Sequence, residues 1–128
     1  MGNDVLIGGY GTTDAADVTA AAMGNIDSDD TLLGNEGNDK LYGDGGTDII
    51  NGDGGNDNIW GGSGNDYITG GEGVNAIFAE DGDDYLTFDG ILDYAWSGTG
   101  HDKLAFDVDG YDGKASINDF DLWDDTLV

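Results

Sequence analysis

The sequence contains, at residues 61–66, the stretch Gly61-Gly62-Ser63-Gly64-Asn65-Asp66, and the apolar Ile68 follows two positions after the aspartate. This pattern recurs every nine residues, and the unit reads G-G-x-G-x-D-x-U-x with U apolar. The acidic or amide place is filled without a slip by Asp30, Asp39, Asp48, Asp57, Asp66, Asn75, Asp84, Asp93 and Asp102. The apolar place is filled by Leu32, Leu41, Ile50, Ile59, Ile68, Ile77, Leu86, Ala95 and Leu104. A fixed short period of this kind indicates a solenoid of stacked units.

The residue types of the unit predict its local structure. Glycine permits positive φ angles and close backbone approach, which favours a tight turn over the first six places. The x-U-x triplet suits a very short strand whose middle side chain points inward. Two units then make one coil of 18 residues, with turns alternating between two edges and strands stacking into two parallel sheets. We therefore predict an all-β fold, a parallel β-roll over residues 30–105.

The charge of the chain points to a cation as its natural partner. Among 128 residues there are 28 acidic and 3 basic ones, and the formal net charge is −25. A charge of this sign disfavours nucleic acids and anionic lipid surfaces as partners. No stretch has the roughly 18 apolar residues of a membrane span. The chain has no Cys and no Pro, so disulfides do not hold it together.

The repeat resembles that of the RTX (repeats-in-toxin, hemolysin-type) family of calcium-binding nonapeptides. The resemblance covers residues 30–105, with a further copy at Gly2-Asn3-Asp4-Val5-Leu6 and a degenerate copy at residues 8–13. It implies a right-handed β-roll that binds Ca²⁺. It also implies a bacterial protein that is secreted, extracellular or on the cell surface, exported by a type I secretion apparatus and carrying other domains in a longer parent chain.

Stacking of the glycine turns would create the metal sites. Ca²⁺ takes six to eight oxygen ligands, and stacked turns offer backbone carbonyls beside an Asp from each loop. On one edge the stacked pairs are Asp30/Asp48, Asp48/Asp66, Asp66/Asp84 and Asp84/Asp102, and on the other Asp39/Asp57, Asp57/Asn75 and Asn75/Asp93. The candidate ligands are Asp30, Gly34, Glu36, Gly37, Asp39, Gly43, Gly45, Gly46, Asp48, Gly52, Gly54, Gly55, Asp57, Gly61, Ser63, Gly64, Asp66, Gly70, Glu72, Gly73, Asn75, Gly82, Asp84 and Asp102.

These sites are not equivalent. The pairs Asp39/Asp57 and Asp48/Asp66 keep glycine and Asp in both loops. Asn75 lowers the charge of two sites, Ile91 replaces a glycine before Asp93, and the loop at residues 25–30 has no glycine. By this ligand count we expect about three to six bound Ca²⁺ ions.

Two segments depart from the repeat. After the first degenerate repeats at residues 1–13, an insertion at residues 14–29 is rich in Ala, and residues 14–24 read as a short helix with Gly24 at its end. Residues 106–128 are expected to cap the last coil, with Ile117, Phe120, Leu122, Trp123 and Leu127 on the apolar side. Their ending resembles the closure after RTX repeats in serralysin-type proteases and mannuronan epimerases. It is a candidate secretion signal or only a cap.

An aromatic residue stands at every eighteenth position, as Tyr42, Trp60, Phe78 and Trp96. These side chains are expected to form one column on the outer face of one sheet. Two interpretations remain open. The column is either a structural ladder, covered by the C-terminal segment or a neighbouring domain, or an exposed surface for a glycan or protein ligand.

The sequence contains no recognisable group of catalytic residues. The chain has one His, His101, at a variable loop place, and its paired carboxylates are accounted for by calcium loops. We expect no enzymatic activity. The sequence favours a calcium-binding module that folds on Ca²⁺ after export and serves in folding, secretion and stabilisation of a larger protein. The alternative is a ligand-binding or adhesive module that uses the aromatic column.

Overall fold

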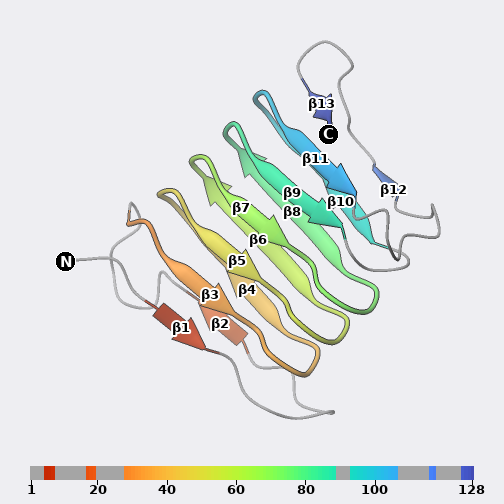
Figure 1. The fold of residues 1–128 in the computed structure, drawn as a ribbon. Coiled ribbons are helices and arrows are strands. Elements are labelled where there is room, and N and C mark those ends of the chain that lie inside the picture. Colours follow the sequence, from red (N-terminus) through yellow and green to blue (C-terminus); the bar gives the residue numbers. More distant parts are fainter. Residues whose placement is uncertain (1–4, 8–16, 20–27, 89–92, 107–115, 118–124) are drawn as a thin grey trace.

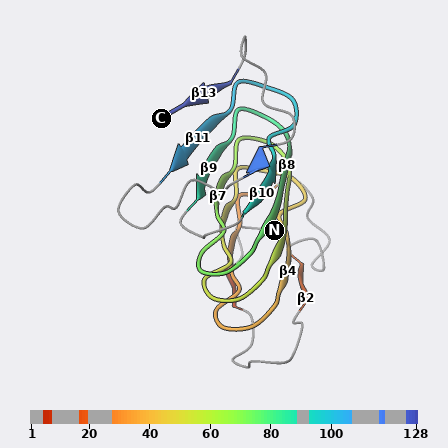
Figure 2. The ribbon, with the colours of Figure 1, turned by 90° about the vertical axis from the view of Figure 1, so that its right-hand side faces the viewer.

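The computed structural model describes residues 5–7, 17–19, 28–88, 93–106, 116–117 and 125–128. Within these residues the chain is an all-β parallel solenoid of about four turns with two parallel sheets (Figure 1). Figure 2 shows the two sheets as the two layers of a flattened roll. No helix in the described part of the chain is long and apolar enough to cross a membrane.

The strands alternate between the two sheets along the chain. Sheet A contains, in order, β1 (Val5–Ile7), β3 (Thr31–Leu33), β5 (Ile49–Asn51), β7 (Tyr67–Thr69), β9 (Tyr85–Phe88), β11 (Lys103–Phe106) and β13 (Thr126–Leu127). Sheet B contains, in order, β2 (Asp17–Thr19), β4 (Lys40–Tyr42), β6 (Asn58–Ser63), β8 (Ala76–Asp81), β10 (Tyr94–Trp96) and β12 (Ser116–Ile117). Every pairing within a sheet is parallel, as predicted from the repeat.

The register confirms the coil of two units. Ile50 pairs with Ile68 in sheet A, and Ile59 pairs with Ile77 in sheet B, so equivalent residues lie 18 positions apart. Because residues 18 positions apart pair directly in parallel register, the same places of the unit face inward in every coil. The U residues accordingly form the core, all of them buried: Leu32, Leu41, Ile50, Ile59, Ile68, Ile77, Leu86, Ala95 and Leu104. Ala79 and Phe88 are also buried in this core.

The turns depend on left-handed backbone at two places of the unit. At the second place φ is 67° for Asn35 and Asp44 and 66° for Asp53, a conformation that Asn and Asp tolerate better than most residues. At the fourth place φ is positive for Gly37, Gly46, Gly55, Gly64, Gly73, Gly82 and Gly100. A Cβ on Gly55 would meet the carbonyl oxygen of Gly37 in the preceding coil. Only glycine lets successive turns stack this closely.

The predicted helix at residues 14–24 is wrong at its centre. Residues Asp17–Thr19 form β2, which pairs with β4 and aligns Val18 with Leu41. Residues 14–16 and 20–27 lie outside the described residues. Helix propensity is a weak preference, and pairing with the exposed edge of a sheet overrides it here. The described residues contain no helix.

Residues 106–128 were predicted to leave the repeat and cap it. Their described part adds a strand to each sheet, since β12 pairs with β10 and β13 pairs with β11, and the predicted cap as a whole stays a prediction. The register aligns Leu104 with Leu127, although Leu127 is 56% exposed. The rest of the predicted cap, including Phe120, Leu122 and Trp123, lies outside the described residues.

Candidate metal centre

The repeat aspartates of successive coils are linked by hydrogen bonds at both edges of the roll. In each of the seven predicted pairs, the backbone N–H of the earlier residue donates to Oδ1 of the residue 18 positions later. The distances are 2.7–2.9 Å for Asp30/Asp48, Asp48/Asp66, Asp66/Asp84 and Asp84/Asp102. They are 2.9–3.0 Å for Asp39/Asp57, Asp57/Asn75 and Asn75/Asp93. The predicted stacking is therefore confirmed for every pair.

In several repeat aspartates the second carboxylate oxygen, Oδ2, has no hydrogen-bond partner. Among the described residues, Oδ2 is buried and accepts no hydrogen bond in Asp48, Asp57, Asp66 and Asp84. Burying an ionised carboxylate without a partner is costly. Desolvation by burial raises the pKa of Asp48, Asp57 and Asp102 to about 6, and that of Asp66 and Asp84 to about 7. The oxygens that need a cation are thus the ones that face into the turns.

Glycine at the first place of a unit opens a space beside this oxygen. A Cβ placed on Gly61 would lie 2.6 Å from Oδ2 of Asp66 and 2.6 Å from the carbonyl oxygen of Ala79 in the next coil. Two oxygens from successive coils thus lie together beside the glycine, where a side chain would clash with both. We call such a space a glycine cradle.

Three other loops have the same arrangement. A Cβ on Gly43 would meet the Gly61 carbonyl and Oδ2 of Asp48, and one on Gly52 would meet the Gly70 carbonyl and Oδ2 of Asp57. A Cβ on Gly34 would lie 2.5 Å from the Gly52 carbonyl oxygen and 2.9 Å from Oδ2 of Asp39. The glycine cradles therefore belong to the loops at residues 34–39, 43–48, 52–57 and 61–66.

The chemistry of the cradles fits Ca²⁺. Their oxygens are carboxylate and backbone carbonyl, the ligands that a hard cation prefers. In the described residues, no three His, Cys, Asp or Glu side chains converge on one metal position. A cation bound here would therefore take most of its ligands from the backbone carbonyls of the turns.

Several predicted ligands lie elsewhere in the turn. The third-place residues bridge successive coils, Glu36 to Gly54, Gly45 to Ser63 and Gly54 to Glu72. The carbonyls of Gly54, Ser63 and Glu72 accept hydrogen bonds from the backbone of Gly37, Gly46 and Gly55. The side chains of Glu36 and Glu72 are exposed. These residues hold the turns together from outside the cradles.

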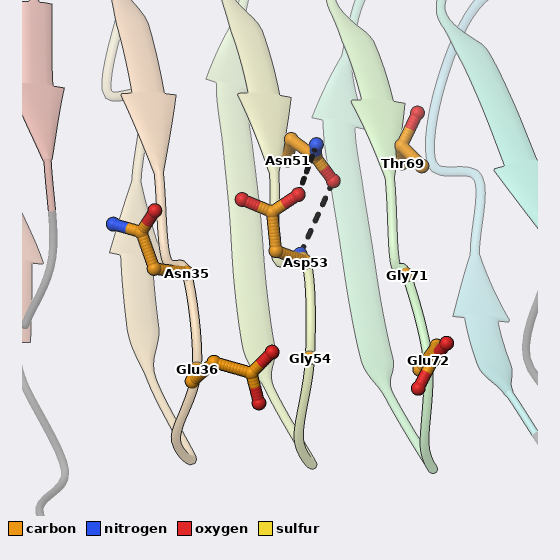
Figure 3. A pocket seen from close by; sticks show the side chains of 8 residues that line it. All are labelled: Asn35, Glu36, Asn51, Asp53, Gly54, Thr69, Gly71 and Glu72. Carbon is orange, nitrogen blue, oxygen red and sulfur yellow. Dashed lines mark hydrogen bonds between the residues drawn. The ribbon is translucent and has the colours of Figure 1, made fainter. Parts of the chain in front are cut away.

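Glu36 and Glu72 line a shallow polar groove on one edge (Figure 3). The groove has a volume of about 440 Å³ and also contains Asn51 and Asp53, whose side chains hydrogen-bond at 2.6 Å. In Figure 3 the Glu36 carboxylate extends over the next coil at Gly54. A Cβ on Gly54 would lie 3.2 Å from both Glu36 carboxylate oxygens. The groove is separate from the cradles, which open toward the inside of the turn.

A second ladder runs outside the first, at the fifth place of the unit. There an exposed side-chain oxygen accepts a hydrogen bond from the backbone 18 residues later. The pairs are Asp29 with Thr47, Asn38 with Asn56, Asn56 with Val74, Asn65 with Asp83 and Asp83 with His101, at 2.8–2.9 Å. His101 is an exposed member of this ladder, in keeping with its prediction as a loop residue.

Asp125 was not predicted as a site residue. The backbone N–H of Asp102 donates to its Oδ1 at 3.2 Å, so Asp125 extends the aspartate ladder by one coil. The spacing from Asp102 is 23 residues, which hides it from a search at a period of nine. The signal in the sequence is the run Asp125-Thr126-Leu127, which repeats the D-x-U triplet.

The aromatic column is a closely stacked ladder. Ring centroids are 4.5 Å apart for Tyr42 and Trp60, 5.6 Å for Trp60 and Phe78, and 4.4 Å for Phe78 and Trp96. The rings lie within 9° of parallel. Each inner ring therefore turns both faces to its neighbours and presents only its edge. A glycan that stacks on an aromatic face has no such face at Trp60 or Phe78, so the geometry favours a structural ladder.

The fold and the site together define a parallel β-roll with oxygen-lined cation cradles along its edges. Two overlapping segments, residues 26–59 and 51–86, match the family model of the RTX calcium-binding nonapeptide repeat. Residues 26–86 thus match RTX calcium-binding repeats, in agreement with the sequence resemblance over this part of the chain. No curated protein and no solved structure matches the chain. The resemblance of residues 106–128 to a particular RTX closure stays a prediction.

The buried carboxylates predict opposite pH dependences with and without calcium. Because burial raises the pKa of Asp66 and Asp84 to about 7, the metal-free roll takes up protons on folding. Its stability is then greatest at low pH and is lost as the pH rises through about 6–7. In EGTA, circular dichroism should show more β structure at pH 5 than at pH 8. In Ca²⁺, protons compete for Oδ2, and the affinity should fall below about pH 7. A metal-free chain less ordered at pH 5 would contradict this.

Proposed function

We propose that this chain is a right-handed RTX β-roll that folds on binding Ca²⁺ after export and stabilises a larger secreted bacterial protein. The observation that carries this proposal is the row of buried Oδ2 atoms without hydrogen-bond partners in Asp48, Asp57, Asp66 and Asp84. In a turn with a purely structural role, buried carboxylate oxygens without partners would only lower stability. A divalent cation between coils satisfies them.

The energetics make folding conditional on the metal. Without a cation, each edge brings carboxylates of successive coils together in a buried turn, and the chain as a whole has a formal net charge of −25. Ordering a residue costs roughly 1–2 kcal/mol of backbone entropy, and each unit buries only one U side chain. A ligand that binds only the folded state adds its binding free energy to stability. Calcium therefore acts as the switch between unfolded and folded chain.

This dependence suits export. RTX repeats are typical of secreted bacterial proteins. An unfolded, calcium-free chain can pass a type I secretion apparatus and then fold where Ca²⁺ is abundant. The proposed partners are therefore calcium, the export machinery and other domains of a parent chain. In this proposal the module itself has no catalytic role.

The test is the calcium concentration at which the chain folds. Extracellular calcium modules bind at about 10⁻⁴–10⁻³ M, whereas intracellular sensors respond at about 10⁻⁷–10⁻⁵ M. We expect the midpoint of a titration, followed by far-UV circular dichroism and by hydrodynamic radius, to fall in the first range. A chain that is already compact at submicromolar Ca²⁺ would contradict folding after export.

A further inference from the structure

One loop of the roll contains a nitrogen where the others present an oxygen. In the loop at residues 70–75, a Cβ on Gly70 would meet Nδ2 of Asn75 at 2.9 Å. In the glycine cradles the corresponding atom is Oδ2 of an Asp. An amide NH₂ is a donor with no lone pair for a cation. This loop therefore differs from its neighbours in chemistry as well as in charge.

The Asn75 side chain is satisfied by the protein. Its Oδ1 accepts from the backbone N–H of Asp57 at 2.9 Å, and its Nδ2 donates to the carbonyl of Gly71 in its own loop at 3.0 Å. These two bonds fix the orientation of the amide, because the reversed amide would face a donor with a donor. The residue is fully buried. The NH₂ group therefore binds a turn carbonyl from inside the loop, which is the task of the cation in a glycine cradle.

The other edge shows a second case with different chemistry. Ser97 takes the first place of its unit, where the cradles have glycine, and it is fully buried. Its hydroxyl donates to Oδ2 of Asp125 at 3.2 Å, while Oδ1 of Asp125 accepts from the backbone of Asp102 at 3.2 Å. The Ser97 side chain thus fills the space that glycine leaves open in the cradles, and its hydroxyl donates a hydrogen bond to the Asp125 carboxylate.

We propose that Asn75 and Ser97 are side-chain substitutes for a calcium ion, one on each edge of the roll. The loops at residues 70–75 and 97–102 are then closed by protein hydrogen bonds, and calcium binds at the loops whose Asp keeps an unpaired Oδ2, the glycine cradles of residues 34–66 among them. This inference rests on the proposed function and refines it, since it states which loops do not use the metal. It also revises Asn75 from a weak ligand to a residue that replaces the ion.

The decisive variant is Asn75→Asp. It keeps the size of the side chain and the Oδ1 acceptor, but it replaces the NH₂ donor by a second carboxylate oxygen beside the Gly71 carbonyl. We expect the full chain to bind about one more Ca²⁺ than the wild type, counted by titration calorimetry and native mass spectrometry. At Ca²⁺ concentrations too low to fill the added site, the variant should melt at a lower temperature than the wild type, because an unpaired buried carboxylate has replaced a satisfied amide.

The matched control is Asn56→Asp. Asn56 lies on the same edge and also accepts a backbone hydrogen bond, from Val74 at 2.9 Å, but it is exposed in the outer ladder. The chain already accommodates a carboxylate at this place, since Asp83 accepts from His101 in the same way. Asn56→Asp adds the same charge outside the loop interior and should leave the ion count unchanged.

The outcomes separate this inference from the proposed function. A folded Asn75→Asp chain with the wild-type ion count would overturn the inference, while the calcium-dependent folding of the wild type would stand. If the wild type bound no Ca²⁺, the proposed function itself would fail. Should Asn75→Asp not fold in Ca²⁺, Ser97→Gly decides: it removes the hydroxyl and opens the first place, and an added ion supports the inference whereas the wild-type count overturns it.

Discussion

Millimolar Ca²⁺ is expected to convert the chain from a largely unfolded form into the β-roll, and equal Mg²⁺ or about 1 M NaCl is not. The glycine cradles explain the difference. They bring carboxylate and carbonyl oxygens from two successive coils together, as beside Gly61, where the oxygens of Asp66 and Ala79 are close neighbours. Mg²⁺ requires a tight octahedron at about 2.0–2.1 Å and dehydrates reluctantly. We therefore expect these oxygens to favour the larger Ca²⁺, which accepts more variable geometry.

Salt and other metals test whether neutralisation alone is enough. Sodium chloride screens the formal net charge of −25 but does not join a carboxylate on one coil to a carbonyl on the next. Zn²⁺ prefers nitrogen and sulfur ligands in tetrahedral geometry, and the chain has one His and no Cys. The measurement is far-UV circular dichroism after EGTA treatment, with each ion added back separately. The same spectrum in Mg²⁺ or salt alone would mean that the core and charge screening suffice, and the proposed function would be wrong.

Asp57→Ala is expected to remove about one bound Ca²⁺, and Asn75→Ala none. Asp57 supplies Oδ2 to the cradle that begins at Gly52, and its Oδ1 accepts from Asp39. Asn75 stands next to it in the ladder but directs Nδ2 to the Gly71 carbonyl. At a free Ca²⁺ concentration about 100 times the dissociation constant, loss of one site costs about 2.7 kcal/mol of calcium-linked stability.

Both substitutions also remove hydrogen bonds, so the comparison must isolate the metal. Asn75→Ala leaves the Asp57 N–H and the Gly71 carbonyl without their partner, at about 1–3 kcal/mol, with or without Ca²⁺. The informative quantities are the calorimetric ion count and the change of melting temperature between low and saturating Ca²⁺. If the two variants lost equal numbers of bound ions, the assignment of Asp57 as a ligand and of Asn75 as a substitute for the calcium ion would be contradicted.

Periodicity made most of the repeat region predictable. A nine-residue register places every U residue at the middle of a strand, and parallel pairing of residues 18 apart repeats its inward direction from coil to coil. The buried series from Leu32 to Leu104, the parallel pairing and the seven stacked aspartate pairs all follow from it. The helix expected at residues 14–24 failed at Asp17–Thr19 because local propensity cannot anticipate the exposed edge of β4.

The sequence by itself determined that carboxylates would stack on carbonyl-rich turns, because spacing alone decides which residues become neighbours in a solenoid. Only the tertiary structure decided which carboxylate oxygen of Asp48, Asp57 and Asp66 accepts no hydrogen bond, because that depends on the direction of the backbone N–H in the preceding coil. It also decided that Asn75 turns its nitrogen inward and that Asp125 continues the ladder. Hydrogen-bond direction and loop closure depend on atomic positions in three dimensions, and a one-dimensional period does not contain them.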